Sequence, residues 1–333
     1  MSPDPLGAAV DLFAGADAVA LVCHVDPDGD ALGSMLGLGA ALRGLGTDVA
    51  AYWGGAPFAV PAALSFLPAL DLLVAPADFP AAPPLLVTLD TGSPDRLGSL
   101  ADRLDSAACT VVVDHHASNT LYGTVNLADP SAAATAVLVE QLVERLGAPL
   151  TPDVAVALYT GLVTDTGSFR HSATTPSVHE LAARLLATDI RHDLINRAIY
   201  DTAPFAYLAL LGGVAARAQL EQAEVGGLGL VWSTVPAEAL AAAGLGLADV
   251  EGVMDVVRTA QEAEVAAVLK ADPLEGGWKV STRSKGAVDV GRVCTALGGG
   301  GHRFAAGYSS SRAAGDVLTE LRAALAHAPH LPA

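Results

Sequence analysis

Short apolar runs of strand length alternate with longer helical segments along the first half of the chain. Residues 18–23 are continuously apolar, which is typical of a strand buried on both faces of a sheet. Three further runs of strand character occupy residues 48–53, 85–89 and 109–113. The segments between and after them predict helices at residues 31–45, 132–146, 152–163, 176–187 and 192–200. Strands that alternate with helices in this way predict an α/β fold with a parallel sheet.

The pattern changes between residues 188 and 204, where short helical segments lead into a second set of strands. These strands are predicted at residues 229–233, 265–270 and 278–282, and helices at 247–260, 288–297 and 313–326. Because 333 residues are more than one core usually holds, we expect two domains with a cleft between them. We predict a catalytic domain at residues 1–190, a linker at 191–204, and a smaller α/β domain with a mixed sheet at 205–330.

Acidic residues and histidines follow several of these apolar runs. The clusters are His24-Val-Asp-Pro-Asp28-Gly-Asp30, Asp90-Thr91, Asp114-His115-His116 and Asp165-Thr166-Gly167. An isolated Asp after a strand is more often a turn residue or a helix cap, so each cluster alone is a weak signal. Open parallel sheets bind ligands at the carboxyl ends of their strands, where three of the clusters lie. The fourth, with Asp165, follows the helix predicted at residues 152–163, and the four together indicate one shared metal site.

The residue types in these clusters indicate which cations they bind. Carboxylates with a minority of imidazoles suit Mn²⁺, with Mg²⁺ and Co²⁺ as the other candidates, and no cysteine contributes to the clusters, which disfavours structural zinc. Four of the aspartates together carry about −4, which two divalent ions offset. Two such ions lower the pKa of a bridging water and stabilise charge on phosphoryl oxygens, so the clusters predict hydrolysis of a phosphate ester.

A second candidate site lies in the predicted C-terminal domain, where Arg283-Ser284-Lys285 is followed by Gly298-Gly299-Gly300-Gly301-His302. A glycine that ends the preceding helix is one explanation of the run. Four consecutive glycines also allow backbone N–H groups to approach a phosphate closely, and Arg283 could bind the same group through two hydrogen bonds. Both interpretations stay open at this point.

Composition restricts the substrates and the cellular location. The net charge of −18 argues against binding of long nucleic acid, which needs many Lys and Arg side chains, so an anionic substrate must be short. Residues 1–29 contain no Lys or Arg, and we find no apolar run of transmembrane length. Three cysteines far apart in the sequence, Cys23, Cys109 and Cys294, are typical of reduced core thiols. We therefore expect a cytoplasmic protein without membrane contact, and Ala- and Gly-rich helices make a homodimer an open alternative.

The four clusters resemble the four motifs of the DHH phosphoesterase superfamily, and the second site resembles its DHH-associated C-terminal domain. By that resemblance one metal is held by His24, Asp28 and Asp90. The other is held by Asp30, Asp90, His115 and Asp165. The resemblance also implies that His116 contacts the scissile phosphate, with Asp114 supporting the histidines. The implied substrate contacts are Arg283, Ser284, Gly299, Gly300, Gly301 and His302.

Together the two halves resemble the oligoribonuclease (nanoRNase) and pAp-phosphatase branch of this superfamily. The resemblance implies release of 5′ mononucleotides from short oligoribonucleotides and dephosphorylation of 3′-phosphoadenosine 5′-phosphate (pAp). Hydrolysis of cyclic di-AMP or linear dinucleotides is the enzymatic alternative, and a nucleotide-sensing module is the alternative without catalysis. A pyrophosphatase fits the glycine run less well, and a long single-strand exonuclease would need a basic groove.

Overall fold

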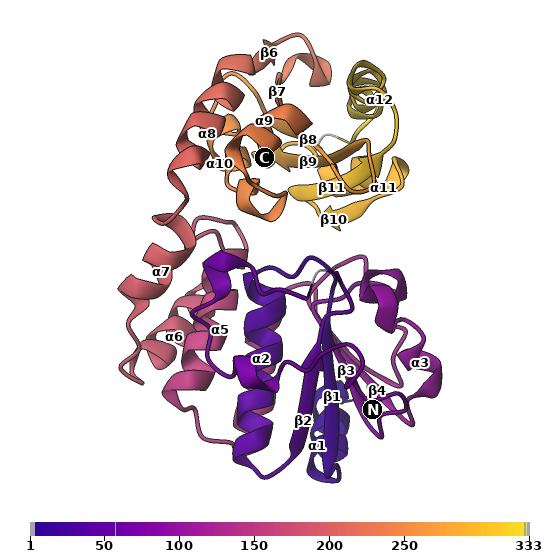
Figure 1. Cartoon of the computed structure of the whole chain (residues 1–333), viewed down its shortest axis with the longest axis vertical. Helices are drawn as coiled ribbons and strands as arrows, with labels where there is room; N and C mark the ends of the chain where they lie inside the picture. The colour runs from indigo at the N-terminus through magenta and orange to yellow at the C-terminus, as the bar shows by residue number, and fades with distance from the viewer. Residues whose placement is uncertain (1–3, 57, 330, 332–333) are drawn as a thin grey trace. The chain divides into compact units, whose positions relative to one another are not determined.

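The chain forms two compact units, the first ending at Thr202 and the second beginning at Ala203. The computed structural model (Figure 1) describes residues 4–56, 58–329 and 331. Each unit has its own sheet and its own hydrophobic core, and each is described by itself. The fold class predicted from the sequence, a parallel sheet followed by a mixed one, is confirmed.

The first unit contains a five-stranded parallel sheet in the order β2-β1-β3-β4-β5. Its strands are β1 (Ala18–Cys23), β2 (Asp48–Tyr52), β3 (Leu86–Leu89), β4 (Thr110–Asp114) and β5 (Val125–Ala128). The strand order reverses between β1 and β3, and ligands of open α/β sheets bind at the carboxyl edge beside such a point. Strand β5 was not predicted because only one of its four residues, Leu127, is buried, so it forms no apolar run.

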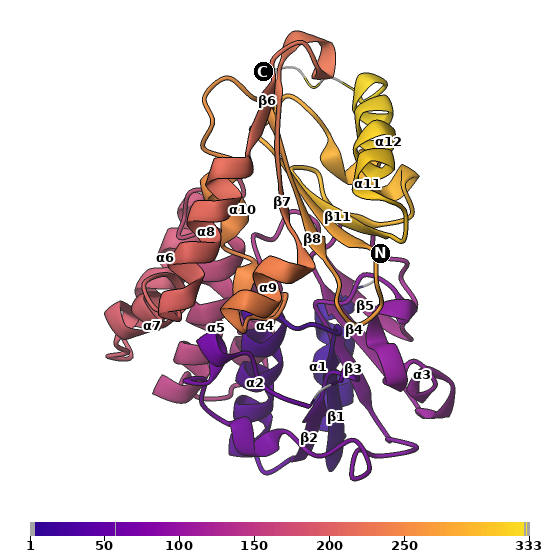
Figure 2. The same cartoon turned by 45° about the horizontal axis from the view of Figure 1, so that its top comes forward.

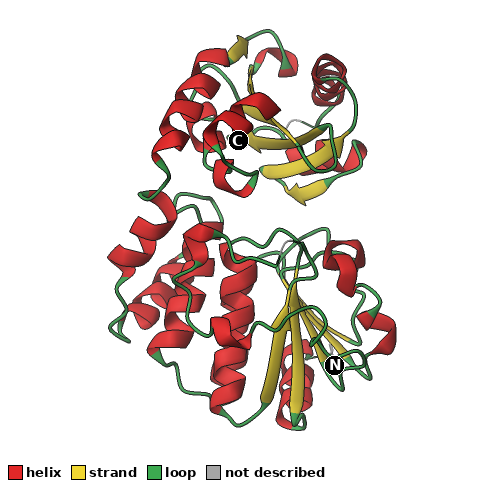
Figure 3. Ribbon diagram, in the orientation of Figure 1, coloured by secondary structure: helices red, strands yellow, loops and turns green. Residues whose placement is uncertain are grey.

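Helices cover the sheet of the first unit (Figure 3). They are α1 (Pro5–Ala14), α2 (Gly29–Gly44), α3 (Arg103–Ser106), α4 (Thr135–Arg145), α5 (Pro152–Asp165), α6 (Pro176–Leu186) and α7 (His192–Tyr200), with 3-10 turns η1 (Ala62–Leu64), η2 (Leu70–Leu72) and η3 (Pro94–Leu100). Helix α1 was not predicted. It begins with Asp4, whose side chain accepts a hydrogen bond from Gly7 N, followed by Pro5 in the first helical position.

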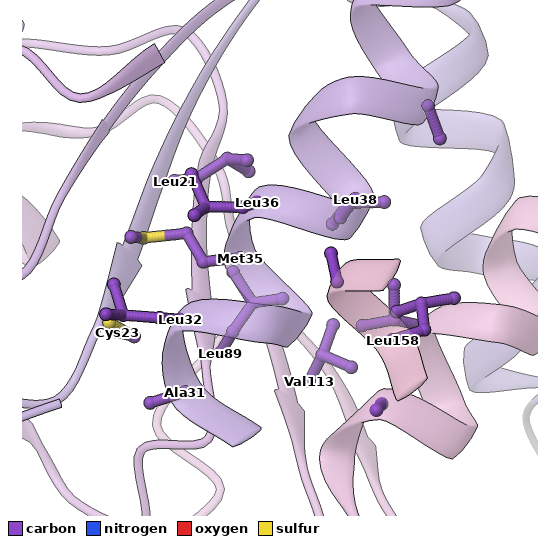
Figure 4. Packing of buried hydrophobic residues seen from close by; sticks show 14 of the residues in the cluster. Leu21, Cys23, Ala31, Leu32, Met35, Leu36, Leu38, Leu89, Val113 and Leu158 are labelled. Atoms are coloured by element: carbon purple, nitrogen blue, oxygen red, sulfur yellow. The ribbon is translucent and has the colours of Figure 1, made fainter. Parts of the chain in front are cut away.

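Helix α2 is the central helix of the first unit. Its residues Leu32, Met35 and Leu36 point toward β1 (Figure 4), and all three are fully buried. On the opposite side, α2 lies so close to α5 that a side chain at Gly33 would overlap the carbonyl oxygen of Ala157. The absence of a Cβ therefore permits a close helix contact, which brings the start of α2 near the end of α5.

The second unit contains a six-stranded mixed sheet in the order β10-β11-β9-β8-β7-β6, in which only β7 and β8 are parallel. Its strands are β6 (Gln219–Glu221), β7 (Leu230–Val235), β8 (Val265–Ala271), β9 (Trp278–Ser284), β10 (Gly300–His302) and β11 (Ala305–Ser310). Its helices are α8 (Phe205–Arg217), α9 (Ala237–Ala243), α10 (Val253–Val257), α11 (Val290–Ala296) and α12 (Ala314–Ala326), with 3-10 turns η4 (Val225–Gly227) and η5 (Ala248–Val250).

Two layers of helices pack on this sheet, α11 and α12 on one face and α8, α9 and α10 on the other (Figure 2). Every residue of β8 is buried because the strand lies between both layers. The helix predicted at residues 247–260 is instead divided into η5 and α10, with Glu251 and Gly252 between them. Helix α8 was not predicted.

Among the described residues no single helix is long and apolar enough to cross a membrane. The bent pair α7 and α8 meets the requirement only when the two helices are taken together, by length and composition.

Candidate metal centre and active site

The carboxyl ends of three neighbouring strands carry the polar residues of the first unit. His24 directly follows β1, Asp90 directly follows β3, and Asp114 is the last residue of β4. Asp90 has a left-handed backbone conformation with φ of 54°, which turns the chain sharply after the strand. Such a conformation is uncommon outside glycine, although Asp tolerates it better than most residues, and it is often found in functional sites.

His24 lies between two carboxylates. Its Nε2 atom is 3.5 Å from Asp90 Oδ2 and 3.9 Å from Asp28 Oδ1. The other ring nitrogen, Nδ1, is 2.7 Å from the carbonyl oxygen of Val25. A proton on Nδ1 satisfies that carbonyl and leaves the Nε2 lone pair directed at the carboxylates, which is the arrangement of a metal-binding histidine.

His115 lies among three carboxylates. Its Nε2 atom is 3.1 Å from Asp165 Oδ2, 3.5 Å from Asp90 Oδ1 and 3.8 Å from Asp30 Oδ2. Its Nδ1 atom is 3.2 Å from the carbonyl oxygen of Ala132, so, as in His24, Nδ1 faces a backbone carbonyl and Nε2 faces the carboxylates. Asp90 belongs to both groups, with Oδ2 facing His24 and Oδ1 facing His115.

The two aspartates at the start of α2 are fixed by backbone N–H groups. Asp28 is the N-cap of α2, and its Oδ1 accepts hydrogen bonds from Asp30 N and Ala31 N. Asp30 is fully buried, and there is room for its carboxylate because α5 has Gly161 at the contact. A Cβ at that glycine would lie only 2.6 Å from Asp30 Oδ1.

Asp114 contacts the ring of His116. Asp114 is fully buried, and its Oδ1 lies 2.7 Å from His116 Nδ1. Its other oxygen accepts a hydrogen bond of 2.5 Å from Asn119 Nδ2. Burial lowers the pKa of His116, but the hydrogen bond to Asp114 and the charge of Asp90 outweigh burial and raise it. Asn119 was not singled out in the sequence.

Opposite charge prevails over burial at the other two histidines. Burial alone would lower the pKa of His115, but Asp165 and the charges of Asp30 and Asp90 raise it to about 11. Burial is outweighed in the same way at His24, where the hydrogen bond to Asp90 raises the pKa. Burial raises the pKa of Asp30 well above its usual range, and the charge of Asp90 adds to the effect. Protons on the imidazoles therefore offset part of the negative charge of this cluster when no metal is bound.

The donor atoms also fit two divalent cations. The ligand atoms of His24, Asp28 and Asp90 lie within 4.8 Å of one another, and so do those of Asp30, His115 and Asp165. Ligands about 2.1 Å from one cation, at angles of about 90–110°, lie about 3.0–3.4 Å apart. The five separations from His24 and His115 range from 3.1 to 3.9 Å and need only a small contraction.

The predicted substrate contacts of the second unit lie on β9, on β10 and at Gly299, just before β10. Arg283 is on β9, where its neighbour across the sheet is Ala305 of β11, and His302 also pairs with Ala305 from β10. The Ser284 side chain is buried, and its hydroxyl donates a 2.7 Å hydrogen bond to Glu264 Oε1 and accepts bonds from two backbone N–H groups. Its role as a substrate contact stays a prediction, because a substrate would have to compete with these three hydrogen bonds.

The glycine run of the second unit has two local structures. Gly298 follows α11 with φ of 85°, and its N–H donates to the carbonyl of Thr295, as in a glycine that ends a helix. Gly299 and Gly301 lie against β11, where a side chain at Gly299 would overlap the carbonyl of Gly307.

The remaining glycine of the run is different from its neighbours. A Cβ at Gly301 would lie 2.7 Å from the carbonyl oxygen of Ala305, but a Cβ at Gly300 would meet nothing within 4 Å. Folding therefore explains three of the four glycines and leaves Gly300 without a structural requirement.

Comparison with known proteins agrees with this geometry. Residues 18–162 match the model of the DHH family, N-terminal domain, and residues 239–328 match that of the DHHA1 domain. The bifunctional oligoribonuclease and PAP phosphatase NrnA of Thermus thermophilus is 36% identical over 288 residues, which cover 86% of this chain and 82% of that protein. The chain belongs to the DHH family. It is a metal-dependent phosphoester hydrolase, and the resemblance seen in the sequence is confirmed.

Other relatives of this DHH-family protein cover different shares of the chain. A probable bifunctional oligoribonuclease and PAP phosphatase NrnA of Streptococcus mutans is 26% identical over 308 residues, covering 92% of this chain and 94% of that protein. The Bacillus subtilis NrnA is 30% identical over 189 residues, 56% of this chain and 58% of that protein. An exopolyphosphatase-related protein from Bacteroides fragilis has the same fold, with a TM-score of 0.83, 24% identity, and coverage of 96% of this chain and 95% of that chain.

The DHH site of this chain contains a supporting residue that the sequence did not reveal. Thr135, at the start of α4, is fully buried. Its backbone N–H donates to Asp30 Oδ2 at 2.6 Å, and its hydroxyl donates to Asp90 Oδ1 at 2.9 Å. One residue thus holds carboxylates from α2 and from the end of β3. A threonine at a helix start is so common that nothing in the sequence distinguished it.

Replacement of Thr135 by valine keeps the shape of the side chain and removes the hydroxyl bond to Asp90. Because partners that orient metal ligands typically contribute 10- to 100-fold to affinity, Thr135→Val should weaken Mn²⁺ binding by about that factor. Thr135→Ser, the matched control, should bind Mn²⁺ nearly as the wild type does. Calorimetric titration of the metal-free proteins measures both, and equal affinity of Thr135→Val and wild type would exclude the proposed support.

Proposed function

We propose that this protein hydrolyses short oligoribonucleotides, with release of 5′ mononucleotides, and also dephosphorylates pAp, using two Mn²⁺ ions. The observation that carries the proposal is the pair of ligand groups that share Asp90. The names of the relatives from Thermus thermophilus and Bacillus subtilis support the choice of substrates. The net charge of −18 favours short substrates over long nucleic acid.

The residues of the first unit have distinct roles in this proposal. His24, Asp28 and Asp90 hold one cation, and Asp30, Asp90, His115 and Asp165 hold the other. When bound, two such cations supply an activated water and stabilise charge on the phosphoryl oxygens. Asp90 is fixed by its left-handed backbone and by Thr135, and it holds the two ligand groups next to each other.

His116 has the properties of a contact to the scissile phosphate. Asp114 accepts a hydrogen bond from its Nδ1 and raises its pKa, which favours the positively charged form of the ring. A charged imidazole donates a strong hydrogen bond to a phosphate oxygen, or transfers a proton to the leaving oxygen. Asp114 acts through His116 by holding the ring and its proton in place.

The second unit is proposed to bind the rest of the substrate. Arg283 and His302 are the side chains assigned to this role, together with the backbone of Gly299, Gly300 and Gly301. Arg283 on β9 and His302 on β10 both pair with Ala305 of β11, the strand between them, so the two side chains come from one part of the sheet. This assignment keeps the proposed division into a catalytic domain at residues 1–190, a linker at 191–204 and a substrate domain at 205–330.

The three free cysteines support a reducing compartment, so we also propose a cytoplasmic location.

A substrate panel tests the proposed function directly. We expect purified protein with Mn²⁺ to turn over pApA and pAp with higher kcat/KM than cyclic di-AMP, pyrophosphate or a long single strand. Asp90→Ala should lower kcat by a factor on the order of 10³ or more, because both ligand groups lose a member. Asp105→Ala, which removes an exposed carboxylate of α3, serves as the control. Preference for cyclic di-AMP would support the alternative substrate, and dinucleotide binding without product would support a sensor.

Gly300 offers a separate test of the second unit. Because a Cβ at this position meets nothing in the protein, Gly300→Ala should leave the melting temperature nearly unchanged. It should raise KM for pApA if a substrate phosphate approaches this backbone, with little effect on kcat. Gly299→Ala is the contrasting variant, expected to lower the melting temperature through overlap with β11. An unchanged KM in Gly300→Ala would leave the glycine run with structural roles only.

A further inference from the structure

Arg96 lies at the edge of the metal-ligand cluster without being one of its predicted members. It belongs to η3, in the segment that follows Asp90, and its residue is exposed. Its carbonyl oxygen accepts a 2.9 Å hydrogen bond from Val25 N, which joins this segment to the chain just after His24. The guanidinium Nη2 atom lies 3.2 Å from His24 Nδ1. A cation is therefore held beside a proposed metal ligand.

Arg96 differs from most arginines of the first unit in having no acidic partner among the described residues. Five others form ion pairs, which are Arg43 with Asp71, Arg103 with Asp102, Arg145 with Asp4, Arg184 with Glu140 and Arg191 with Asp193. In a chain with 36 acidic and 18 basic residues, an arginine beside a proposed metal ligand with no acidic partner in the described part of the chain is unexpected.

His24 does not satisfy the hydrogen-bonding capacity of Arg96. Its Nδ1 atom is 2.7 Å from the carbonyl of Val25, a bond that requires a proton on Nδ1. The same tautomer is required for Nε2 to bind a cation, because a neutral imidazole carries only one proton. A protonated Nδ1 cannot accept from Arg96, so the guanidinium donors that face His24 are available to another acceptor.

The backbone around Arg96 is fixed at both ends, so little ordering is needed for binding. One anchor is the hydrogen bond between Val25 N and the Arg96 carbonyl. The other is Ser99, whose backbone N–H and hydroxyl both donate to the carbonyl of Gly54, at 3.1 and 2.8 Å. A cation on a fixed segment binds an anion at lower entropic cost than one on a free loop.

We propose that Arg96 binds an oxygen of the phosphate that is cleaved and favours a dianionic terminal phosphate in that position, such as the 3′-phosphate of pAp, over a monoanionic diester such as that of pApA. Two divalent cations offset the charge of about −4 on the four aspartates and leave no excess positive charge. The second negative charge of a terminal phosphate then depends on His116 and Arg96 for compensation. Arg96 supplies a planar group suited to phosphate oxygens. This inference rests on the proposed function for its substrates.

Arg96→Gln tests the inference in the Mn²⁺-loaded full-length protein. Loss of a charge-assisted hydrogen bond should weaken binding of inorganic phosphate by about 10- to 100-fold. The value of kcat/KM should fall by a similar factor for pAp and by a clearly smaller factor for pApA, and Arg96→Lys should fall between wild type and Arg96→Gln. Mn²⁺ affinity, measured by calorimetry, should not change.

Arg145→Gln is the matched control because it removes one positive charge at the far end of α4, about 15 Å along the helix from Thr135. It should leave phosphate binding and both kcat/KM values unchanged. Unchanged phosphate affinity in Arg96→Gln, equal losses for pAp and pApA, or weaker Mn²⁺ binding would each overturn the inference. The effect of Arg96→Gln on phosphate affinity can be measured even if the wild type hydrolyses neither substrate. In that case the proposed function fails, but phosphate binding by Arg96 is still tested.

Discussion

The close approach of four aspartate carboxylates in one mostly buried place is the constraint on which the first unit depends. Such a group is stable only if positive charge lies among its members. Without metal that charge comes from protonated imidazoles, as the pKa of about 11 at His115 indicates. Metal binding must therefore displace protons, so Mn²⁺ affinity and proton release are coupled. The site is a charge-balanced cluster in which protons and cations compete for the same carboxylates.

The fold brings these charges together through a few local features. Parallel strands end at a common edge, which places His24 and Asp90 side by side. The glycine contact between α2 and α5 brings Asp30 close to Asp165, and the left-handed backbone of Asp90 turns its carboxylate toward both groups. These features restrict the chain or require an unusual backbone conformation, as is common where a site is preorganised for binding.

The features that could be predicted from the sequence are those whose signal lies within a short stretch of chain. Strands β1, β3 and β4 are continuous apolar runs, and the acidic and histidine clusters follow them directly. Thr135 could not be predicted because it contacts Asp30 from more than a hundred residues away. Arg96 could not be singled out from the sequence, because only the structure shows that it has no acidic partner among the described residues. Strands β10 and β11 were not predicted because their many glycine, alanine and serine residues give no strand pattern. The four-glycine run at 298–301 did indicate the end of α11 correctly.

The number of metal ions bound by each chain is the most direct test of the shared binuclear site. Metal-free protein should be titrated calorimetrically with Mn²⁺ at one pH in two buffers of different ionisation enthalpy. The account predicts two ions per chain and release of protons from the histidine rings, seen as a buffer-dependent heat. Binding of a single ion, or of two ions with no proton release, would contradict the charge-balanced cluster described above.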